Sequence, residues 1–483
     1  MRILHYYWVD PQDPAGRGGG VRVYLQALVA AQNAVPGVET CTFSSGLAYD
    51  LRNKMPRWHS SQLGHYEIVN SATLAPSHAD FATHAQLHDA PTTATFLEFV
   101  KCTGPYDVLH LHGLEGIPAE ILASKQHFPE MRLVLSLHNY HAFCPQVNLW
   151  WQEQAHCADF DAGARCSTCL PTPARPGVVR AAYRVETVLT RLSMGPGTLA
   201  YDRAWRVVIR FAWRLLKRLL RRGKVQANSP PSNELPKMAT VFRERRAGIV
   251  RLINTYCDTV LAVSERTRQI AEQFGLEGVR TSYIGTMHAR HWGMTSPRDL
   301  PRAYSAARPL RLTYLGYMRR DKGFGFLLDA LSDLPPQHLT RVHLCIAARR
   351  GDSDVIAAMT RLTPTLAGLD WHDGYDHGDL DQILAKTDFG LVPPLWEDNL
   401  PQTALEMHSR HIPLITSDRG GAQELGNCPA LTFAAGDKAA FCALIVRVLE
   451  GAVPMTEYWT HARAPISMAD HVQDLLKQYA GSS

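Results

Sequence analysis

The sequence predicts an α/β protein with two doubly wound domains, each built on a parallel sheet. The chain has 483 residues, which is more than one ordinary hydrophobic core holds and therefore indicates two domains. Short β-rich apolar runs recur along the chain, and most intervals between them have a helix-like pattern. Strands that alternate with helices, and that are apolar on both faces, favour parallel sheets covered on two sides.

The elements follow one another in the order that such sheets require. The predicted strands of the first half are MRILHYYWV, DVLHLH, LVLSLHN and DTVLAVS, with helices in VYLQALVAAQ and RTRQIAEQFG. Those of the second half are LRLTYLGY, VHLCIAA, LDWHDGY, FGLVPPL, IPLITS and ALTFAA, with helices in GFLLDALSDL, DLDQILAKT and ALEMHSRH.

The alternation breaks at about 290–308, in HWGMTSPRDLPRAYSAARP, a polar stretch with three prolines and no clear period. Such a stretch is typical of a linker. We therefore predict a first domain at 1–295 and a second at 303–455. The segment 456–483 is predicted to be helical and to pack back on the first domain. A Pro- and Gly-rich region at about 170–250 is predicted to be a helical insertion in the first domain.

Composition is that of a globular protein, with 46% hydrophobic and 20% charged residues. No run of eighteen uncharged apolar residues occurs, and the start MRILHYYWVD lacks the features of a signal peptide. We therefore expect a cytoplasmic protein with reduced thiols. Six cysteines in or near apolar stretches are expected to be small core residues: Cys41, Cys102, Cys257, Cys345, Cys428 and Cys442.

The basic charge of the chain is concentrated in RAWRVVIRFAWRLLKRLLRRGK, residues 203–224. This segment holds nine Lys and Arg and no acid, and the rest of the chain has 41 basic against 45 acidic residues. Its basic residues recur every three or four positions, so they share one face of a helix whose other positions include tryptophan and leucine. This pattern predicts a helix lying in an anionic membrane surface. The alternative is a helix packed on the core with a solvated basic face. Nucleic acid is not expected, because no base-stacking platform or groove-reading motif accompanies the charge.

A loop rich in polar groups follows the predicted strand FGLVPPL. It runs WEDNLPQTALE and contains Asp398, Asn399, Leu400, Pro401 and Glu406. In an open α/β sheet, ligands bind at the carboxyl ends of strands, and backbone N–H groups at a helix start suit phosphate. Two acids that flank such a loop would accept hydrogen bonds from hydroxyls. The loop therefore indicates a ligand with hydroxyls at both ends and phosphates between them, such as a nucleotide sugar. The alternative is a helix N-cap with a solvated Glu406.

Two further loops suit phosphate groups. Arg319, Arg320 and Lys322 crowd the turn between a strand that ends at Gly316 and a helix that begins near Phe324. Basic side chains there would neutralise a diphosphate leaving group, unless they form only a solvated turn. The glycines of GRGGG, which are Gly18, Gly19 and Gly20, follow the first strand and allow close approach to a phosphate or form a flexible loop.

Two histidines end neighbouring strands of the first domain. His138 ends LVLSLH, and His112 has the same position in the preceding strand. We expect His138 to contact the sugar or phosphate of a donor, and the alternative for both is a hydrogen-bonded histidine at a strand end.

The order of these features resembles the retaining glycosyltransferases of family 4. The similar pieces are GGG, DVLHLHGLEG, LSLHNYHAFCP, DTVLAVSERTRQIAEQFG, YLGYMRRDKGF, GYDHGDLDQILAKTDFGLVPPLWEDNLPQTALEM and LITSDRGGAQEL, which cover most of both halves. The resemblance implies a GT-B fold, in which two Rossmann-like domains face a cleft. It also implies transfer of a sugar from a UDP- or GDP-sugar without a catalytic metal.

The resemblance implies a role for each matching residue. The acidic pair E-x7-E of the family falls on Asp398, which would bind hydroxyls of the transferred sugar, and on Glu406, which would bind the ribose. Lys322 matches the lysine that holds the diphosphate, and His138 matches the histidine near the donor sugar. The catalytic residues implied are thus His138, Asp398 and Lys322. Further contacts to the nucleotide sugar are expected from Gly18, Gly19, Gly20, Arg319, Arg320, Asn399, Leu400 and Pro401.

The sequence departs from the family pattern at two positions. The first acid is Asp398, which is one methylene shorter than glutamate. Tyr317 stands where the family usually has an arginine, so Arg319 or Arg320 would have to supply that charge. The mechanism implied needs no carboxylate nucleophile, because the departing diphosphate takes the proton of the acceptor. The D-x-D matches at 159–161, 352–354 and 379–381 end no predicted strand clearly and are not expected to bind metal.

A cysteine group follows His138. Cys144, Cys157, Cys166 and Cys169 lie within 26 residues, and the last two form C-S-T-C. Four thiolates with one C-x2-C pair predict a structural zinc that shapes the loop, and the alternative is four free thiols.

These features together predict a GT-B glycosyltransferase that is peripheral on the inner face of the cell membrane. Its acceptor would be a lipid-linked glycan or a glycolipid, as in the biosynthesis of polysaccharide. A sugar epimerase or phosphorylase of the same fold is the rival enzyme, and an inactive membrane-docking protein is the rival of another class. Donor turnover without an acceptor would indicate an epimerase, and a need for inorganic phosphate or pyridoxal phosphate would indicate a phosphorylase.

Overall fold

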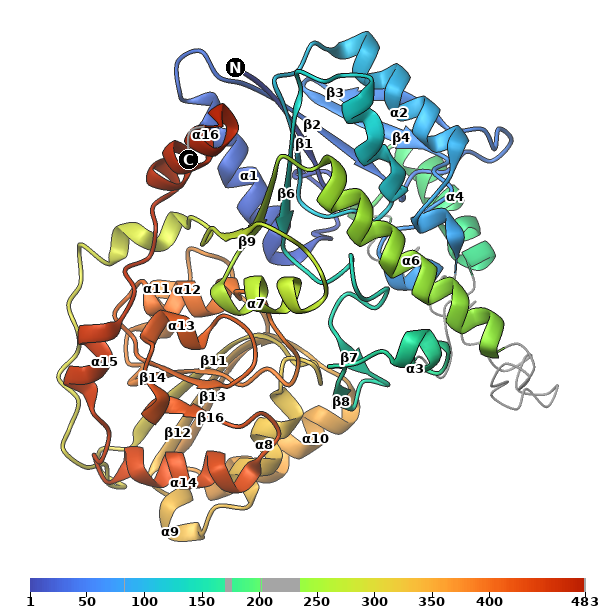
Figure 1. The fold of residues 1–483 in the computed structure, drawn as a ribbon. Coiled ribbons are helices and arrows are strands. Elements are labelled where there is room, and N and C mark those ends of the chain that lie inside the picture. The colour runs from blue at the N-terminus through green and yellow to red at the C-terminus, as the bar shows by residue number, and fades with distance from the viewer. Residues whose placement is uncertain (82, 170–175, 200, 202–234, 482–483) are drawn as a thin grey trace. The chain divides into compact units, whose positions relative to one another are not determined.

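The computed structural model of the chain describes residues 1–81, 83–169, 176–199, 201 and 235–481. The chain forms two compact units (Figure 1). Unit 1 comprises Met1–Leu261, Ala271–Arg280 and Leu475–Ser483, and unit 2 comprises Ala262–Ile270 and Thr281–Asp474. The predicted basic helix at 203–224 lies outside the described residues.

Unit 1 is built on an eight-stranded sheet in the order β10-β9-β6-β5-β1-β2-β4-β3. The pairs β1–β2, β1–β5, β2–β4 and β5–β6 are parallel, and the edge pair β3–β4 is antiparallel. The chain runs outward from β1 in both directions, so the point where the strand order reverses lies between β1 and β5. The strands are β1 Arg2–Tyr6, β2 Glu39–Ser45, β3 Arg57–Gln62, β4 His65–Val69, β5 Val108–Leu111, β6 Arg132–Leu137, β9 Thr259–Ala262 and β10 Val279–Thr281.

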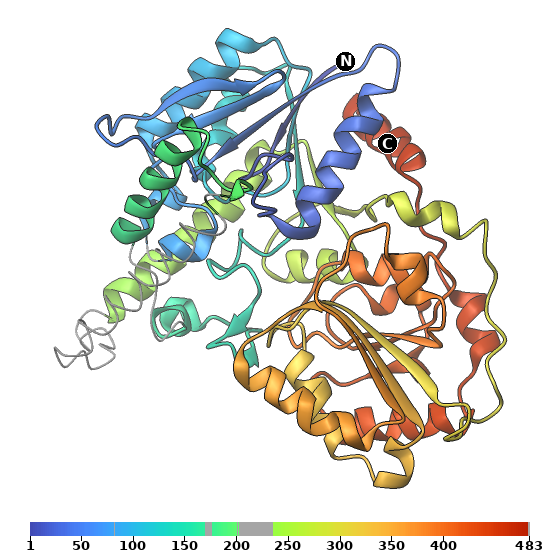
Figure 2. The same ribbon diagram turned by 180° about the vertical axis from the view of Figure 1, so that it is seen from behind.

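Helices cover the sheet of unit 1 (Figure 2). The longest is α6, which buries Phe242, Ile249 and Ile253 and so adds the last part of the predicted insertion to the packed structure. The helices are α1 Gly19–Asn33, α2 Ala90–Thr103, α3 Ala164–Ser167, α4 Pro176–Arg191 and α6 Leu235–Tyr256, with 3-10 turns η1 Ser77–Asp80, η2 His84–Gln86, η3 Ala119–Gln126 and η4 Asp161–Gly163. A small hairpin pairs β7 Trp150–Trp151 with β8 Ala155–His156.

Unit 2 is built on a six-stranded sheet in the order β13-β12-β11-β14-β15-β16, and all its strand pairs are parallel. The strand order reverses between β11 and β14, so the loops after these two strands border the same crevice of the sheet edge. The strands are β11 Leu310–Tyr317, β12 Val342–Arg349, β13 Gly368–His372, β14 Phe389–Val392, β15 Leu414–Ser417 and β16 Thr432–Phe433.

The helices of unit 2 pack on both faces of this sheet and bury one continuous core. Leu312, Ile346, Phe389, Phe324 and Phe441 are members of it, and each is at most 1% exposed. The helices are α7 Glu265–Gln273, which ends in unit 1, α8 Phe324–Ser332, α9 Pro336–Leu339, α10 Ser353–Leu362, α11 Leu380–Leu384, α12 Gln402–His408, α13 Gln423–Gly426, α14 Lys438–Leu449, α15 Met455–His461 and α16 Met468–Ala480. The 3-10 turns are η6 Met287–His291, η7 Thr363–Thr365 and η8 Pro429–Leu431.

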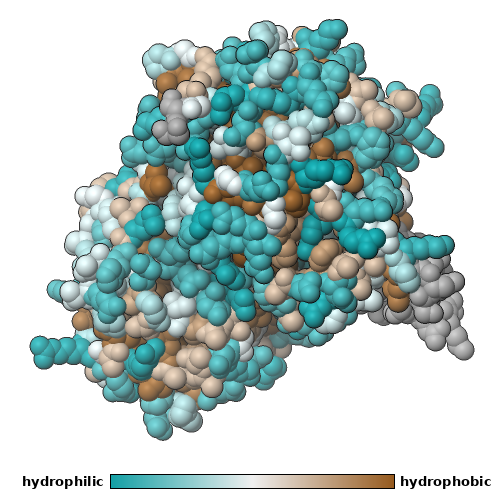
Figure 3. Space-filling view, viewed as in Figure 1, coloured by the Kyte–Doolittle hydropathy of each residue, from teal (hydrophilic) through white to brown (hydrophobic). Residues whose placement is uncertain are grey.

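Most predicted elements are present, with local differences. All ten predicted strands and the five predicted helices occur, whereas six observed strands have no counterpart in the prediction: β2, β3, β4, β7, β8 and β10. The C-terminal segment forms two helices, α15 and α16, rather than one, because the connection 462–467 contains Pro465. Cys102 is exposed, so its assignment to the core is wrong. Hydrophilic side chains cover most of the face in Figure 3, as expected when helices bury both faces of a sheet.

Candidate active site

The loops after β11 and β14 bring a lysine and a carboxylate into contact. Lys322 lies in the turn between β11 and α8, and its Nζ donates to Oδ2 of Asp398 over 2.6 Å. Asp398 lies in the loop between β14 and α12 and is 7% exposed, while Lys322 is half-buried. The lysine also lies over the ring of Trp396, 5.0 Å from its centroid. Two residues that are 76 positions apart thus meet where the strand order of unit 2 reverses.

A glycine fixes the turn that carries Lys322. Gly323 has a φ of 74°, in the left-handed region, and a Cβ atom there would lie 1.7 Å from the carbonyl oxygen of Pro393. Only glycine allows this approach between the start of α8 and the end of β14. The close packing therefore sets the position of Lys322 relative to the loop of Asp398.

Glu406 lies on α12, one turn and a half beyond that loop, and is 3% exposed. Its Oε2 accepts a hydrogen bond from the hydroxyl of Tyr375 over 2.9 Å, and its Oε1 lies 3.6 Å from Nδ1 of His377. Burial raises the pKa of Glu406, and the contacts with Tyr375 and His377 work in the opposite direction. A nearly buried carboxylate with few fixed partners is suited to accept hydrogen bonds from hydroxyls of a ligand.

A guanidinium beneath α12 anchors Glu406. Arg410 donates to the carbonyl oxygen of Glu406 over 2.8 Å and to Oδ1 of Asp381 over 2.8 Å. Its Nη1 lies 3.3 Å from Nδ1 of His288, and burial, together with Arg410, lowers the pKa of His288 to about 3. The neutral ring accepts from Arg410 at Nδ1 and carries its proton on Nε2, which faces His377.

The same segment contains a buried carboxylate that the sequence motif did not single out. Glu397 is 0% exposed and accepts from Arg266 over 2.6 and 3.0 Å, from Arg419 over 3.0 Å and from the Gly420 N–H over 2.9 Å. Burial opposes its ionisation, but Arg266 and the other donors outweigh that effect and lower its pKa. Glu397 therefore ties the loop of Asp398 to the first turn of α7.

The remaining predicted donor residues lie around this loop. Arg319 forms a two-pronged ion pair with Asp321, over 2.7 and 2.9 Å, and its side chain is 64% exposed. Arg320 and Tyr317 are exposed beside it. The Asn399 amide donates to Thr267 over 3.2 Å. Leu400 is 7% exposed and Pro401 precedes the first residue of α12.

In unit 1, the predicted glycine loop begins α1. Gly18 has a φ of 82°, and a Cβ there would lie 2.5 Å from Val9 and 2.8 Å from Tyr7, so the loop packs directly on the segment that follows β1. The hydroxyl of Tyr7 donates to the carbonyl oxygen of Gly18 over 3.0 Å. Gly19 and Gly20 form the first turn of α1.

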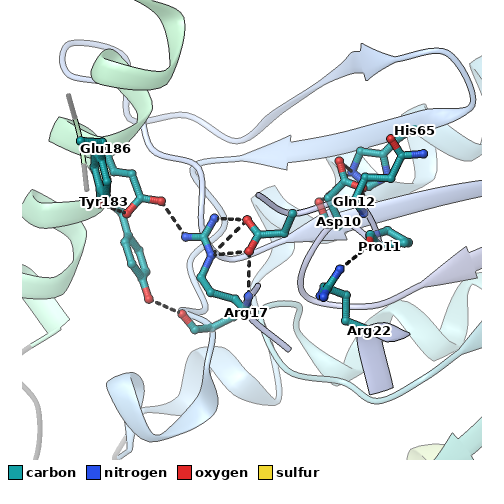
Figure 4. Close-up of polar contacts among 12 residues, drawn as sticks. Asp10, Pro11, Gln12, Arg17, Arg22, His65, Tyr183 and Glu186 are labelled. Carbon is teal, nitrogen blue, oxygen red and sulfur yellow. Dashed lines mark hydrogen bonds and ion pairs between the residues drawn. The ribbon is translucent and has the colours of Figure 1, made fainter. Parts of the chain in front are cut away.

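The arginine before these glycines is held by two acids. Arg17 forms ion pairs with Asp13 over 2.5 Å and with Glu186 of α4 over 2.6 Å (Figure 4). Tyr183, one turn earlier on α4, donates to the carbonyl oxygen of Ala75 (Figure 4). The helix α4 is thereby fixed beside the glycine loop.

His112 and His138 follow β5 and β6, which are adjacent in the sheet of unit 1. Nδ1 of His112 lies 3.1 Å from Nε2 of His138, so the two rings share a hydrogen bond. His112 is fully buried, and His138 is half-buried at the strand end.

The four cysteines of the predicted zinc site lie in the segment 144–169. The thiol of Cys169 donates to Oε1 of Gln146 over 3.0 Å, and that of Cys157 donates to the carbonyl oxygen of Asp159 over 3.4 Å. Burial raises the pKa values of Cys166 and Cys169 to about 12. Within the part of the chain that the structure describes, two groups of three side chains have ligand atoms within 4.8 Å of one another, and neither contains a cysteine. The zinc assignment stays a prediction.

The two groups are His5, His110 and His112 in unit 1, and His288, His377 and Glu406 in unit 2. In the second group, the proton on Nε2 of His288 and the donation from Arg410 to its Nδ1 compete with metal binding.

Three side chains of the site were missed from the sequence: Tyr375, Glu397 and Arg410. Tyr375 follows β13 in GYDHG, and the rule that ligands bind at strand ends applies to it as well. Glu397 directly precedes Asp398, but only Asp398 matches the acidic pair of the resembled family. Arg410 has no local signal, because its partners come from three separate segments.

Comparisons with known proteins agree with this geometry. Residues 309–451, which contain all six strands of the sheet of unit 2, match the sequence model of the family described as glycosyl transferases group 1. Among solved structures, the chain is similar to sucrose-phosphate synthase from Thermosynechococcus elongatus, with a TM-score of 0.54, 14% identity and 100% of both chains covered. No curated protein matches the chain.

Two further structures are similar over 100% of both chains. They are Anabaena Alr3699/HepE in complex with UDP, with a TM-score of 0.53 and 13% identity, and the lipopolysaccharide outer core galactosyltransferase WaaB in its apo form, with a TM-score of 0.54 and 14% identity. At these identities the likeness establishes the fold, and the GT-B fold that the sequence predicted is confirmed. The matched domain and the fold together support a glycosyltransferase of the GT-B type.

Proposed function

We propose that the protein is a retaining glycosyltransferase that moves a sugar from a UDP- or GDP-sugar to a lipid-linked glycan or a glycolipid. The observation that carries the proposal is the contact between Lys322 and Asp398 over 2.6 Å, inside the matched domain and at the point where its strand order reverses. Ligands of open α/β sheets bind at this point.

Lys322 and α8 supply the binding site for the diphosphate. The ammonium group is held at the start of α8, where the helix dipole adds partial positive charge. The ion pair of Lys322 is with Asp398, and an incoming diphosphate would replace Asp398 as the partner of the ammonium group. Asp398 then turns its carboxylate to the hydroxyls of the transferred sugar. Arg319 reaches the diphosphate only by leaving Asp321.

Glu406 binds the ribose of the nucleotide. Its carboxylate is oriented by Tyr375 and its backbone is fixed by Arg410, so it can accept two hydrogen bonds from the ribose hydroxyls without moving. The solved structure of Alr3699/HepE holds UDP on the same fold, which favours a nucleotide donor.

The chemistry proposed keeps the sugar configuration and uses no metal and no carboxylate nucleophile. The acceptor oxygen attacks the anomeric carbon from the face that the diphosphate leaves. The bond from that carbon to the phosphate oxygen breaks, and the departing oxygen takes the acceptor proton. Lys322 stabilises the charge of the leaving group, and such a preorganised donor contributes most in the transition state. His138 contacts the donor sugar, and Gly18, Gly19 and Gly20 meet the phosphates or the acceptor.

We place the protein at the inner face of the cell membrane, held through residues 203–224. Among the helices of the described residues, none is long and apolar enough to span a bilayer. The likeness to a galactosyltransferase of the lipopolysaccharide outer core fits an acceptor in a membrane-bound glycan.

Product formation tests the proposal. Radiolabelled UDP- and GDP-sugars, supplied with a bacterial membrane extract, are expected to label the lipid fraction with one donor only. Conversion of the donor without any acceptor would indicate an epimerase, and absence of product with every donor would contradict the proposal.

A further inference from the structure

The aromatic ring of Trp396 lies beside the lysine of the proposed donor site. Nζ of Lys322 lies over this ring, 5.0 Å from its centroid, and 2.6 Å from Oδ2 of Asp398. An ammonium group within about 6 Å of an aromatic face is attracted to it, and tryptophan attracts it most. The ammonium group therefore has two neighbours of different kinds, a carboxylate and a neutral ring, and both belong to the loop between β14 and α12.

Backbone hydrogen bonds fix this loop on either side of the ring. The N–H of Leu395 donates to the carbonyl oxygen of Asp321, in the turn between β11 and α8, over 2.9 Å. The N–H of Asp398 donates to the carbonyl oxygen of Trp396 over 2.8 Å. The carbonyl oxygen of Asp398 in turn accepts from the N–H of Gly421, which follows β15, over 3.0 Å. The backbone that carries the ring is thus tied to the turns after β11 and β15.

The two neighbours of Lys322 differ in what a ligand does to them. In the proposed function, Asp398 turns to the hydroxyls of the transferred sugar and so leaves the ammonium group. A neutral ring has no charge that a hydroxyl or a phosphate replaces, so its contact with the ammonium group is compatible with either ionic partner. The lysine side chain is flexible and 27% exposed, and an ion pair at such exposure holds a side chain only weakly.

We propose that Trp396 is a positioning residue that holds the ammonium group of Lys322 in place while its ionic partner changes from Asp398 to the diphosphate. This inference rests on the proposed function, in which Lys322 stabilises the diphosphate leaving group. A lysine that is already oriented loses less side-chain freedom on binding and stays aligned with the departing oxygen. That oxygen belongs to the phosphate next to the sugar, which a nucleoside monophosphate lacks. The ring therefore favours a nucleoside diphosphate over a monophosphate.

The contact between the ring and the lysine is measured by 1H–13C NMR of protein labelled with 13C-lysine. The Lys322 signals are identified by their loss in Lys322→Arg. Protons over the face of a tryptophan ring are shielded, so we expect an upfield shift of the ε-CH2 protons that disappears in Trp396→Leu. The shift is expected to persist in Asp398→Asn and in the presence of UDP or GDP. Loss of the shift in Asp398→Asn would overturn the proposal, because the carboxylate would then be what holds the lysine.

Two variants of Trp396 test its effect on binding. Trp396→Leu removes the aromatic face and is expected to weaken the binding of UDP or GDP by about fivefold, with unchanged affinity for the corresponding monophosphate. Trp396→Phe keeps an aromatic face and is expected to recover most of that affinity. It also sacrifices no hydrogen bond, since the indole N–H is buried and has no hydrogen-bond partner within the described part of the chain. Equal diphosphate affinity of Trp396→Leu and the wild-type protein would contradict the inference.

A double variant separates positioning of Lys322 from packing of the loop. If Trp396 acts through the lysine, Lys322→Ala with Trp396→Leu is expected to bind the diphosphate as Lys322→Ala does, whereas losses that add would overturn the proposal. Trp151→Leu is the matched control, because Arg165 lies over the ring of Trp151, 5.6 Å from its centroid, in unit 1. It is expected to leave nucleotide affinity unchanged. If Trp396→Leu does not fold, the Lys322 spectrum of Asp398→Asn decides.

The titrations distinguish this inference from the proposed function. Diphosphate binding that depends on Lys322 but not on Trp396 would overturn the inference and leave the assignment of Lys322 to the diphosphate intact. Wild-type protein that binds neither UDP nor GDP would contradict the proposed function, and the shift of the Lys322 protons would still report their contact with the ring.

Discussion

At the scale of residues, the pair Lys322 and Asp398 is the centre of the proposed donor site. Each neutralises the other at 2.6 Å, so a variant of one leaves a charge on the other. Lys322→Ala is expected to lower kcat by about 10²- to 10³-fold, because it removes a preorganised donor to the leaving group. Steady-state kinetics with the identified donor check this, and Lys322→Arg is expected to recover part of the loss.

A variant of Asp398 provides a matched control for the variants of Lys322. Asp398→Glu restores the side chain that the resembled family usually has, and it is expected to retain activity while changing the preference among donor sugars. Equal activity of Lys322→Ala and the wild-type protein would contradict the assigned role.

In the proposed donor site, the raised pKa of Glu406 is expected to make nucleotide binding depend on pH. Burial raises its pKa in the folded protein, so protonation extends to a higher pH than for an ordinary glutamate. Only the carboxylate accepts from two ribose hydroxyls. Affinity for the nucleotide is therefore expected to fall by about tenfold per pH unit once the pH drops below the raised pKa. Glu406→Gln, measured at the same pH values, is expected to bind weakly and to lack this component.

The raised pKa of Glu406 also makes the free energy of unfolding depend on pH. Between its ordinary and its raised pKa, Glu406 binds a proton in the folded state and not in the unfolded state. Its contribution to the free energy of unfolding is therefore present at low pH and is lost as the pH rises through the raised pKa.

At the scale of elements, Glu397 connects the loop before α12 to α7. Its carboxylate is fully buried and is shared by Arg266 and Arg419. Glu424 adds to the connection by accepting from the backbone N–H groups of Glu265 and Arg266 at the start of α7, over 2.9 and 2.7 Å. The loop that carries Asp398 thus depends on a helix more than 120 residues away in the chain.

Removing the carboxylate that Arg266 and Arg419 share is expected to destabilise the protein. Glu397→Ala removes the buried carboxylate that Arg266 and Arg419 share, and it should lower the free energy of unfolding by roughly 3–5 kcal/mol. Denaturant unfolding of Glu397→Ala, Arg266→Ala and the double variant measures the coupling. A double variant as unstable as the sum of the single ones would show that the pair does not couple these elements.

The helices and strands differ in how well the sequence predicts them. Strands such as LRLTYLGY are mostly apolar and were predicted, because most of their residues are buried. β3, RWHSSQ, lies at the sheet edge and is polar, and β2, ETCTFSS, is buried through small polar residues, so neither has an apolar signal. Lys322, Asp398 and Glu406 follow strand ends and were found by that rule. Glu397 and Arg410 act through contacts that no local pattern encodes.

At the scale of the whole molecule, the charge is divided unevenly. Residues 203–224 carry nine basic side chains, and without them the chain has four more acidic than basic residues. Deleting 203–224 is therefore expected to release the protein from anionic vesicles, while wild-type binding weakens as salt is added. Vesicle flotation measures this, with neutral vesicles as the control. Unchanged binding after the deletion would contradict the membrane role of the segment.

Donor chemistry is expected to survive that deletion, because Lys322, Asp398 and Glu406 belong to unit 2 and His138 lies outside the deleted segment. Hydrolysis of the donor by the truncated protein separates loss of the membrane contact from loss of the fold.

Calorimetric titration of the whole protein with UDP and GDP is the most direct test of whether this site binds a nucleotide. We expect one of the two to bind to the wild-type protein, and we expect Lys322→Ala and Glu406→Gln each to weaken that binding by about tenfold or more. Absence of binding by both nucleotides, or equal affinity in all three proteins, would contradict the assignment of this site to a nucleotide-sugar donor.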